Sequence, residues 1–233
     1  MPKFCAVIVA AGRGVRFGRP KQLIDLAGHP LVSWSLHVFG EMPELDALVI
    51  ATEEENVEVM RGLASAYAPR LETKVVSGGA TRQGSVRNAL AAVPEHCSAV
   101  FVHDGARPLI NEVDVRAGMA AVRPGIGALL ASPVVDTIKV VPPGTRSVAR
   151  TLERAELWAA QTPQFAMLCD LVRAHEAAER DGISATDDMS LFEHLGLEVV
   201  VVPAKTENFK VTHPGDLDVV EAIMRERIAR LDA

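Results

Sequence analysis

The chain has 233 residues, of which 48% are hydrophobic, and this is enough to form one sizeable core. Its formal net charge is −6, from 24 Lys and Arg against 30 Asp and Glu, and only 4% of its residues are aromatic. We therefore expect neither a nucleic-acid surface nor a membrane surface, and any bound anion must be held by a local cluster of cations.

The three cysteines, Cys5, Cys97 and Cys169, lack the spacing of a metal site and lie in or beside apolar runs. We interpret them as reduced, mostly buried thiols of a cytoplasmic protein. The first apolar run is too short for a signal peptide, and no stretch approaches the roughly 20 apolar residues that a membrane span needs.

Short apolar, β-branched runs alternate with amphipathic stretches along the chain. Such runs, apolar on both faces, are typical of strands in a parallel sheet that is covered by helices. The expected strands are Phe4–Ala10, Leu48–Thr52, Thr73–Val76, Ala99–Val102, Ala128–Ser132 and Val199–Val202. The alternation predicts a Rossmann-like α/β fold, with a mostly parallel sheet, helices on both faces and right-handed crossovers.

Apolar residues recur at helical spacing between these runs, and Thr81 and Asn111 can cap two of the helices that the spacing predicts. No internal repeat, low-complexity tract or linker interrupts the pattern, so we expect residues 1–233 to form a single domain. The helix-forming sets are Leu31, Trp34 and Val38; Val86, Ala89, Leu90 and Val93; and Leu217, Val220, Met224, Ile228 and Leu231.

Residues 136–160 break the alternation. This stretch starts strand-like, turns at Pro142-Pro143-Gly144 and returns through Ser147–Leu152. Two strand-like segments around a Pro-Pro-Gly turn predict a protruding β-hairpin arm. A lone hairpin is marginally stable in water, so we expect the arm to pack on something, with a second subunit as one candidate.

A glycine-rich loop, residues 10–22, follows the first expected strand and is the first motif with a chemical meaning. Gly12 and Gly14 let the backbone turn sharply and point amide groups at phosphate oxygens, and Arg16 and Lys21 add fixed positive charge. Triphosphate chemistry needs such charge in its transition state. The alternative is a tight surface loop with solvated basic residues, but the loop lies where open α/β sheets bind ligands.

Two familiar phosphate loops fit this segment badly. A dinucleotide fingerprint needs a third glycine where the chain has Phe17, and a Walker A loop needs Gly before and Ser or Thr after Lys21, where Pro20 and Gln22 stand. The segment is therefore a phosphate loop of a third kind.

A second glycine motif, residues 78–86, links an expected strand to a helix. Gly79, Arg82 and Ser85 lie where a helix N-terminus and a nearby cation suit an anion or the edge of a base. The alternative is an ordinary turn between a strand and a helix.

The third motif, residues 103–108, follows the expected strand Ala99–Val102. Asp104 could hold a hydroxyl group or a magnesium ion, and Arg107 could hold a phosphate or Asp104 itself. The alternative is a purely structural Asp–Arg pair. His103 is equally compatible with a packed, hydrogen-bonded histidine.

Further polar side chains are scattered over later loops, where hydroxyls and cations suit a polyol phosphate. Within the Asp187-Asp188 pair, the alternative to a functional role is a helix start before Met189. These scattered residues are Thr137, Arg154, Gln161–Gln164, Thr186–Asp188 and Asn208–Thr212.

Taken in order, the motifs resemble those of the 2-C-methyl-D-erythritol 4-phosphate cytidylyltransferase family of the non-mevalonate isoprenoid pathway, over the range from Val7 to about Asp218. The glycine loop with Pro-Lys-Gln is shared by many sugar nucleotidyltransferases. The series Gly-Gly-x-x-Arg-x-x-Ser-Val, His-Asp-x-Ala-Arg-Pro, Asp-Thr-x-Lys, Gln-Thr-Pro-Gln, Thr-Asp-Asp and Lys-Val-Thr is far more specific.

The resemblance implies a nucleotidyltransferase that moves the cytidylyl group of CTP to 2-C-methyl-D-erythritol 4-phosphate and releases pyrophosphate. It implies that Arg16 and Lys21 stabilise the charge of the transferred and leaving phosphates, and that Arg154 and Lys210 orient the acceptor phosphate. The CTP-binding residues that it implies are Ala10, Ala11, Gly12, Gly14, Gly79, Arg82 and Ser85. The acceptor-binding residues that it implies are Asp104, Arg107, Thr137, Thr162, Thr186 and Thr212.

The resemblance also implies a Mg²⁺ ion held mainly by the CTP phosphates, and we expect no set of protein ligands for it. It implies a homodimer in which the 136–160 arm reaches the neighbour's active site. One departure is Ala80, where relatives often carry an acidic residue, so only a backbone contact is expected there. Two alternatives stay open: a cytidylyltransferase for ribitol 5-phosphate, and a non-catalytic nucleotide-binding module.

Overall fold

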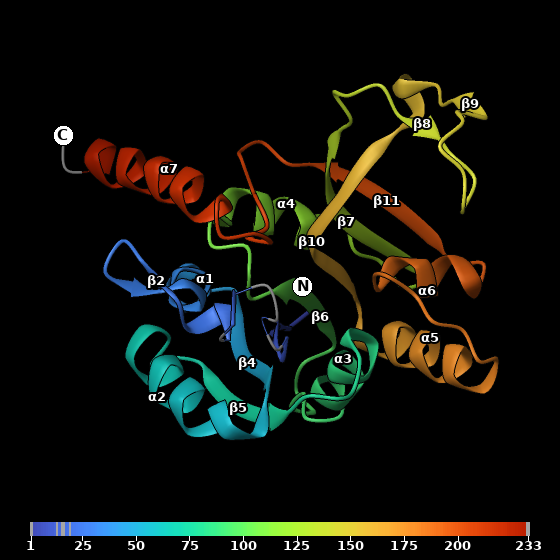
Figure 1. Ribbon diagram of the computed structural model, residues 1–233. Coiled ribbons are helices and arrows are strands. Elements are labelled where there is room, and N and C mark those ends of the chain that lie inside the picture. The colour runs from blue at the N-terminus through green and yellow to red at the C-terminus, as the bar shows by residue number, and fades with distance from the viewer. Residues whose placement is uncertain (1, 13, 15–16, 19, 232–233) are drawn as a thin grey trace.

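The computed structural model describes residues 2–12, 14, 17, 18 and 20–231, with side chains described as far as residue 227. Its centre is a seven-stranded sheet in the order β11-β7-β10-β6-β1-β4-β5 (Figure 1). All neighbours pair in parallel except β10, which is antiparallel to both β6 and β7. The strands are β1 (Phe4–Ala10), β4 (Leu45–Thr52), β5 (Glu72–Ser77), β6 (Ala99–Asp104), β7 (Ile126–Pro133), β10 (Trp158–Met167) and β11 (Glu198–Pro203).

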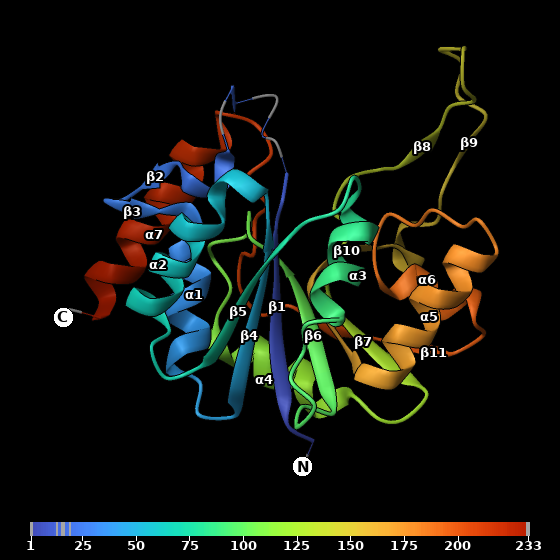
Figure 2. The same ribbon diagram turned by 90° about the horizontal axis from the view of Figure 1, so that it is seen from below.

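Two helical layers cover the sheet, because side chains alternate across each strand. Ala6 and Ile8 of β1 face the core under α1, α2 and α4, whereas Cys5 and Val7 face the core under α3, α5 and α6. Figure 2 shows α1 and α2 on one side and α3, α5 and α6 on the other. The helices are α1 (Leu31–Glu41), α2 (Val57–Tyr67), α3 (Arg82–Leu90), α4 (Glu112–Ala121), α5 (Leu168–Arg180), α6 (Met189–His194) and α7 (Asp216–Leu231).

The remaining elements are short. Helix α7 packs over the start of α1, where Val220 and Met224 join a third apolar cluster with Leu31. Two-stranded ribbons and single 3₁₀ turns complete the fold: β2 (Asp25–Leu26), β3 (His29–Pro30), β8 (Lys139–Val140), β9 (Arg150–Thr151), η2 (Lys21–Leu23), η3 (Glu54–Asn56) and η4 (Arg154–Glu156).

The predicted helix caps are confirmed. The Thr81 side chain accepts a hydrogen bond from the Gly84 amide at the start of α3, and Asn111 accepts one from the Asp114 amide at the start of α4. Val93, which the helical spacing assigned to the first of these helices, lies beyond its last residue, Leu90.

The sequence did not predict β10. This strand contains Gln161, Thr162, Pro163 and Gln164, so it lacks a continuous apolar run, and a proline argues against a central strand. Pairing between β10 and β7 is irregular between Ala160 and Gln164, and this irregularity accommodates the proline. The strand is nevertheless central, and its polar residues lie at the edge of the sheet where the other motifs gather.

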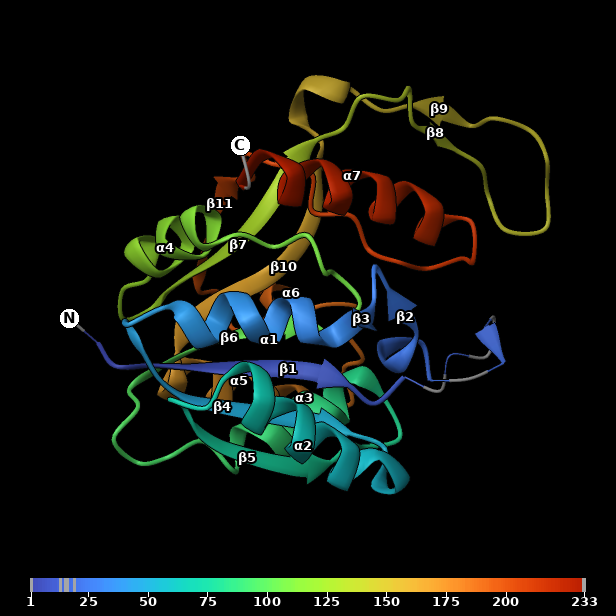
Figure 3. The same ribbon diagram turned by 90° about the vertical axis from the view of Figure 1, so that its left-hand side faces the viewer.

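The predicted hairpin arm is confirmed, with a shift in its bounds. Its two short strands, β8 and β9, are antiparallel, and the arm projects away from the sheet (Figures 2 and 3). The last three residues of the predicted range, from Trp158, belong to β10 instead, because Trp158 pairs with Pro133 of β7.

The prediction of mostly buried thiols is correct for Cys5 and Cys97 and wrong for Cys169, which is exposed. Cys169 lies in the first turn of α5, whose buried face carries Leu171 and Ala174 instead. Within the part of the chain that the structure describes, no helix is long and apolar enough to cross a membrane.

Candidate active site

A cavity of about 1200 Å³ lies at the carboxyl ends of the parallel strands β1, β4, β5 and β6. Open α/β sheets bind ligands at this edge, because the loops that leave the strands there surround a crevice. The cavity gathers residues from all three predicted motifs. Its lining includes Ala11, Gly12, Lys21, Gly79, Arg82, Ser85, Asp104 and Lys210.

One wall comes from the glycine-rich loop after β1. Ala10 is the buried last residue of that strand, and Gly14 has a φ of 56°, a backbone conformation that favours glycine. Lys21 begins η2, lines the cavity and donates a hydrogen bond from Nζ to the Val211 carbonyl oxygen, 3.1 Å away. Arg16 lies outside the described residues, so its predicted role stays a prediction.

The second wall comes from the turn between β5 and α3, which is built tightly around its glycines. A Cβ on Gly78 would lie 2.3 Å from Ala11 Cβ, and one on Gly79 would lie 2.7 Å from the Gly84 carbonyl carbon. The Ser85 hydroxyl accepts a hydrogen bond from the Gly79 amide at 3.0 Å and donates one to the Thr81 carbonyl. This wall therefore presents backbone groups to the cavity at fixed positions.

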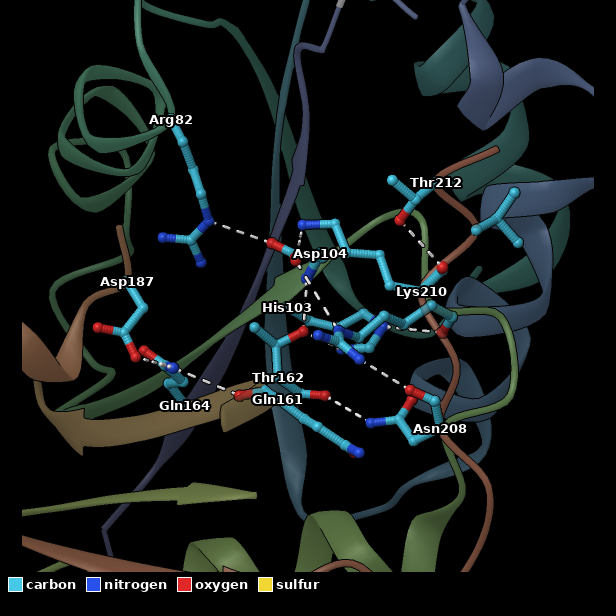
Figure 4. A network of polar contacts seen from close by, with 12 residues as sticks. Arg82, His103, Asp104, Gln161, Thr162, Gln164, Asp187, Asn208, Lys210 and Thr212 are labelled. Carbon is cyan, nitrogen blue, oxygen red and sulfur yellow. Dashed lines mark hydrogen bonds and ion pairs between the residues drawn. The ribbon is translucent and has the colours of Figure 1, made fainter. Parts of the chain in front are cut away.

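Asp104, the last residue of β6, is at the centre of the polar contacts (Figure 4). Arg82 Nε lies 3.1 Å from its Oδ1, Lys210 Nζ lies 2.7 Å from its Oδ2, and Arg107 Nε lies 3.8 Å from its Oδ2. Arg107 thus lies within ion-pair distance of Asp104, and its role toward a phosphate stays a prediction. Three cations from three separate segments, one of them the start of α3, thus converge on one carboxylate.

The Asp104 carboxylate is held in its charged form. Burial alone would raise the pKa of Asp104, but Arg82, and next Lys210, hold that pKa well below its usual value. Asp104 is therefore ionised and balances part of the positive charge. Because three cations face one cavity carboxylate, the cluster favours an anionic ligand.

His103 and Thr162 hold Asp104 from behind. The Thr162 hydroxyl accepts a hydrogen bond from the Asp104 amide at 2.9 Å and lies 3.3 Å from His103 Nδ1. His103 Nε2 lies 3.1 Å from Ser35 Oγ and 3.2 Å from the Arg107 carbonyl oxygen. Burial lowers the pKa of His103 to about 3, so the ring is neutral and acts as a packed, hydrogen-bonded histidine.

A third loop, residues 208–212, closes the site beside Lys210. The Asn208 side chain donates a hydrogen bond from Nδ2 to the Thr162 backbone carbonyl oxygen at 2.8 Å. The backbone carbonyl oxygen of Asn208 accepts one from Nη1 of Arg107, also at 2.8 Å. The Thr212 hydroxyl donates to the Lys210 carbonyl oxygen at 3.2 Å. Thr162 and Thr212 therefore lie against the residues of the cavity rather than in its lining.

Three predicted residues lie elsewhere. Thr137 and Arg154 belong to the arm and are exposed, and Thr186 is an exposed residue of the loop before α6. Arg154 donates a hydrogen bond to the Val135 carbonyl oxygen at 2.8 Å and lines a separate hollow of about 410 Å³ with Trp158. The single chain does not bring these three residues to the cavity.

Gln164 and Asp188, which the sequence placed among the scattered polar residues without a specific role, support the site. The Gln164 side chain accepts hydrogen bonds from the amides of Asp188 and Met189, and the Asp188 carboxylate contacts Arg82. Gln164 ends the motif Gln-Thr-Pro-Gln and Asp188 ends the motif Thr-Asp-Asp. These motifs were the only features of the sequence that pointed to the two residues. Their contacts join segments far apart in the chain, which periodicity does not reveal.

A cavity with a glycine-lined wall and converging cations, at this edge of a mostly parallel sheet, defines the class: the protein is an α/β nucleotidyltransferase. The family model for 2-C-methyl-D-erythritol 4-phosphate cytidylyltransferase matches residues 4–226. The chain belongs to this family.

Individual relatives agree. The 2-C-methyl-D-erythritol 4-phosphate cytidylyltransferase of Halalkalibacterium halodurans is 40% identical over 230 residues, with 98% of this chain and 100% of the relative covered. The crystal structure of the enzyme of that name from Thermus thermophilus has 32% identity and a TM-score of 0.76, covering 94% of this chain and 98% of that one. A synthase structure from Anaerococcus prevotii, at 24% identity and a TM-score of 0.84 over 95% of this chain and 98% of that one, shares the fold.

The family fixes the reaction class. The protein catalyses CTP-dependent cytidylyl transfer to 2-C-methyl-D-erythritol 4-phosphate in isoprenoid precursor biosynthesis. The ribitol 5-phosphate alternative and the non-catalytic alternative are not favoured.

Proposed function

We propose that the transfer is a direct in-line displacement within the cavity. An oxygen of the acceptor phosphate attacks the α-phosphorus of CTP, the bond from that phosphorus to the bridging oxygen breaks, and pyrophosphate leaves with the electron pair. The products are 4-diphosphocytidyl-2-C-methyl-D-erythritol and pyrophosphate. The convergence of Arg82, Arg107 and Lys210 on the cavity carboxylate Asp104 is the observation that carries this proposal. Such a site acts by positioning and by stabilising charge, without a protein nucleophile.

The two ends of the cavity suit the two substrates. At the glycine walls, backbone groups and the Ser85 hydroxyl would bind CTP, with Arg16 and Lys21 stabilising its phosphates. At the Asp104 end, Lys210 would hold the acceptor phosphate. The proposed CTP-binding residues are Ala10, Ala11, Gly12, Gly14, Gly79, Arg82 and Ser85. The proposed acceptor-binding residues are Asp104, Arg107, Thr162 and Thr212, with Thr137 and Thr186 outside the cavity of the single chain.

We propose that Mg²⁺ accompanies CTP and is held mainly by its phosphate oxygens. Within the described ranges, no three His, Cys, Asp or Glu side chains are grouped so as to hold a metal ion. Asp104 is ionised, but both its oxygens are engaged by Arg82 and Lys210. Triphosphate oxygens and water are ligands that Mg²⁺ prefers, which supports binding through CTP.

The arm supports a proposal about assembly. It carries the exposed apolar side chains Val141 and Val148, and the exposed Val135 and Trp158 stand at its base. Exposed apolar side chains grouped on a projecting segment favour a protein partner. We propose a homodimer in which Arg154 and Thr137 of the arm serve the neighbour's cavity, in a single-domain, cytoplasmic enzyme.

Pyrophosphate release tests the proposed function. Purified protein is given CTP and Mg²⁺ with 2-C-methyl-D-erythritol 4-phosphate, with ribitol 5-phosphate, or with no acceptor. We expect release with the first acceptor alone. Equal release with ribitol 5-phosphate would contradict the proposed acceptor end, and release without any acceptor would contradict the direct displacement.

A further inference from the structure

Asp188 is a buried carboxylate that the mechanism above does not use. It precedes the first residue of α6 and is only 1% exposed. Its Oδ2 lies 2.9 Å from Nη2 of Arg82, a residue 106 positions earlier in the chain. The contact joins the start of α6 to the start of α3 at the wall of the cavity.

Capping of α6 does not explain this carboxylate. The Asp188 side chain makes no capping hydrogen bond, and its neighbour Asp187 accepts one from the Ser190 amide at 3.0 Å. Asp187 therefore caps α6. The interpretation of the Asp187-Asp188 pair as a helix start explains Asp187 and leaves Asp188 unexplained.

Arg82 is shared between two carboxylates. Its Nη2 contacts Asp188, and its Nε lies 3.1 Å from Oδ1 of Asp104. A guanidinium is a planar fork that can bridge two such groups in a fixed orientation, which a single ammonium cannot do. Asp188 is buried, whereas Asp104 faces the cavity. Arg82 therefore connects a buried carboxylate to the carboxylate at the cavity.

Asp188 also contacts residues of β10 and α5. Its backbone amide donates to Gln164 Oε1 at 2.9 Å, and its Oδ1 lies 3.5 Å from Nε2 of the buried His175 of α5. Burial alone would raise the pKa of Asp188, but Arg82 lowers it, so the carboxylate is charged. A buried ion pair is a poor source of stability, because desolvation offsets most of its attraction, so its presence at a cavity wall calls for another explanation.

We propose that Asp188 is a positioning residue for the transfer reaction: through Arg82 it sets the orientation of Asp104, and hence of Lys210, at the acceptor end of the cavity. The proposal rests on the proposed function of that cavity. Asp188 lies behind Arg82 and belongs to neither of the two glycine-rich loops.

A double-mutant cycle tests this. Asp188→Asn, Arg82→Gln and the double variant are compared with the wild type for kcat/KM and for the Tm shift that CTP alone produces, which needs no turnover. If Asp188 acts through Arg82, Asp188→Asn lowers kcat/KM about tenfold or more in the wild type, and less than about threefold when Arg82 is already Gln.

Asp187→Asn is the matched control, because it removes the charge of the adjacent carboxylate, which contacts Ser190 and Gln164 and not Arg82, and asparagine can still cap α6. Asp187→Asn should change kcat/KM by the same factor in the wild type and in Arg82→Gln. If the role of Asp188 is purely structural, Asp188→Asn should lower kcat/KM by the same factor in the wild type and in Arg82→Gln, and that result would overturn the proposal. An unchanged kcat/KM in Asp188→Asn would also overturn it. Absence of turnover in the wild type would instead contradict the proposed function.

Arg82→Lys keeps the proposal testable if Asp188→Asn does not fold. Lysine retains the charge but cannot reach both carboxylates, so we expect kcat/KM to fall about as far as in Arg82→Gln. Retention of more than about half of the wild-type kcat/KM would show that charge suffices and would overturn the bridging role of Arg82.

Discussion

Lys210 Nζ lies 2.7 Å from Oδ2 of Asp104, so the cation proposed for the acceptor phosphate is oriented by a carboxylate of the same site. A flexible lysine has much rotamer entropy to lose, and this ion pair removes part of that freedom before a phosphate arrives. Preorganisation of this kind favours reaction, because the charge need not be repositioned during the transfer.

Lys21→Ala should lower kcat by about two or more orders of magnitude, the scale of losing one charge contact to the transition state. Lys21 lines the cavity and also bonds to the Val211 carbonyl, so Tm is measured alongside kcat. Lys74→Ala, at an exposed position of β5, is the control and should leave kcat unchanged. A tenfold or smaller loss in Lys21→Ala would limit Lys21 to binding.

Gly79→Ala and Gly84→Ala form a matched pair in one turn. A Cβ on Gly79 would meet backbone atoms of Gly84 at 2.7 and 2.9 Å, whereas a Cβ on Gly84 would have Thr81 Oγ1 as its nearest contact, at 3.4 Å. We expect Gly79→Ala to cost about 1–3 kcal/mol of unfolding free energy and to weaken CTP binding. Gly84→Ala should be neutral or stabilising by up to about 1 kcal/mol, since alanine favours the helix. Equal effects in urea unfolding would contradict this.

His103 should make stability depend on pH in a defined window. Burial lowers its pKa to about 3 in the folded protein, against about 6.5 in the unfolded chain. Below pH 6.5 the unfolded chain binds a proton that the folded protein does not, so stability falls as pH falls. Between pH 6.5 and 4.5 this amounts to roughly 2.5 kcal/mol.

The measurement is urea unfolding at both pH values. His103→Gln should be less stable overall, yet should lose less stability than the wild type on acidification. The same substitution at His37, exposed on α1, serves as the control and should keep the wild-type slope. An unchanged slope in His103→Gln would mean that the buried ring is not the group that titrates.

The arm proposal predicts complementation between two inactive variants. Arg154→Ala lacks one cation of the arm and Lys21→Ala lacks one in the cavity, so a mixed dimer would retain one intact site if the arm serves the neighbour. We expect mixing to restore part of the activity, measured as pyrophosphate release after subunit exchange. Mixing either variant with itself is the control. Confirmed exchange without recovery would place Arg154 outside the neighbour's site.

Much of the sheet was predictable because its parallel strands are buried on both faces. The apolar run Phe4–Ala10 coincides with β1, since both faces of that strand meet helices. β10 was not predictable, because Gln161–Gln164 break the apolar run at the centre of the sheet. The strand violates the usual pattern at the point where it supplies Thr162 to Asp104.

The site was predictable where charge and glycine fall in short motifs, as around Gly12, Arg82 and Asp104. Asp188 was not, because a carboxylate before a helix is usually a cap, and only the fold reveals that Asp187 takes that role. Likewise, no local pattern could show that His103 is enclosed between Ser35 and Thr162.

The arm leaves and re-enters the sheet at a paired point, where Pro133 of β7 faces Trp158 of β10 and the Val134 amide bonds to the Leu157 carbonyl. The residues between Pro133 and Trp158 are an insertion into the antiparallel pair that β7 and β10 form. Its length can change without shifting the register of either strand, since closing a longer or shorter loop costs little. In the proposed homodimer, a short turn in place of the arm would therefore leave the fold of each subunit intact while removing both the subunit contact and the residues Thr137 and Arg154 that serve the neighbour's site.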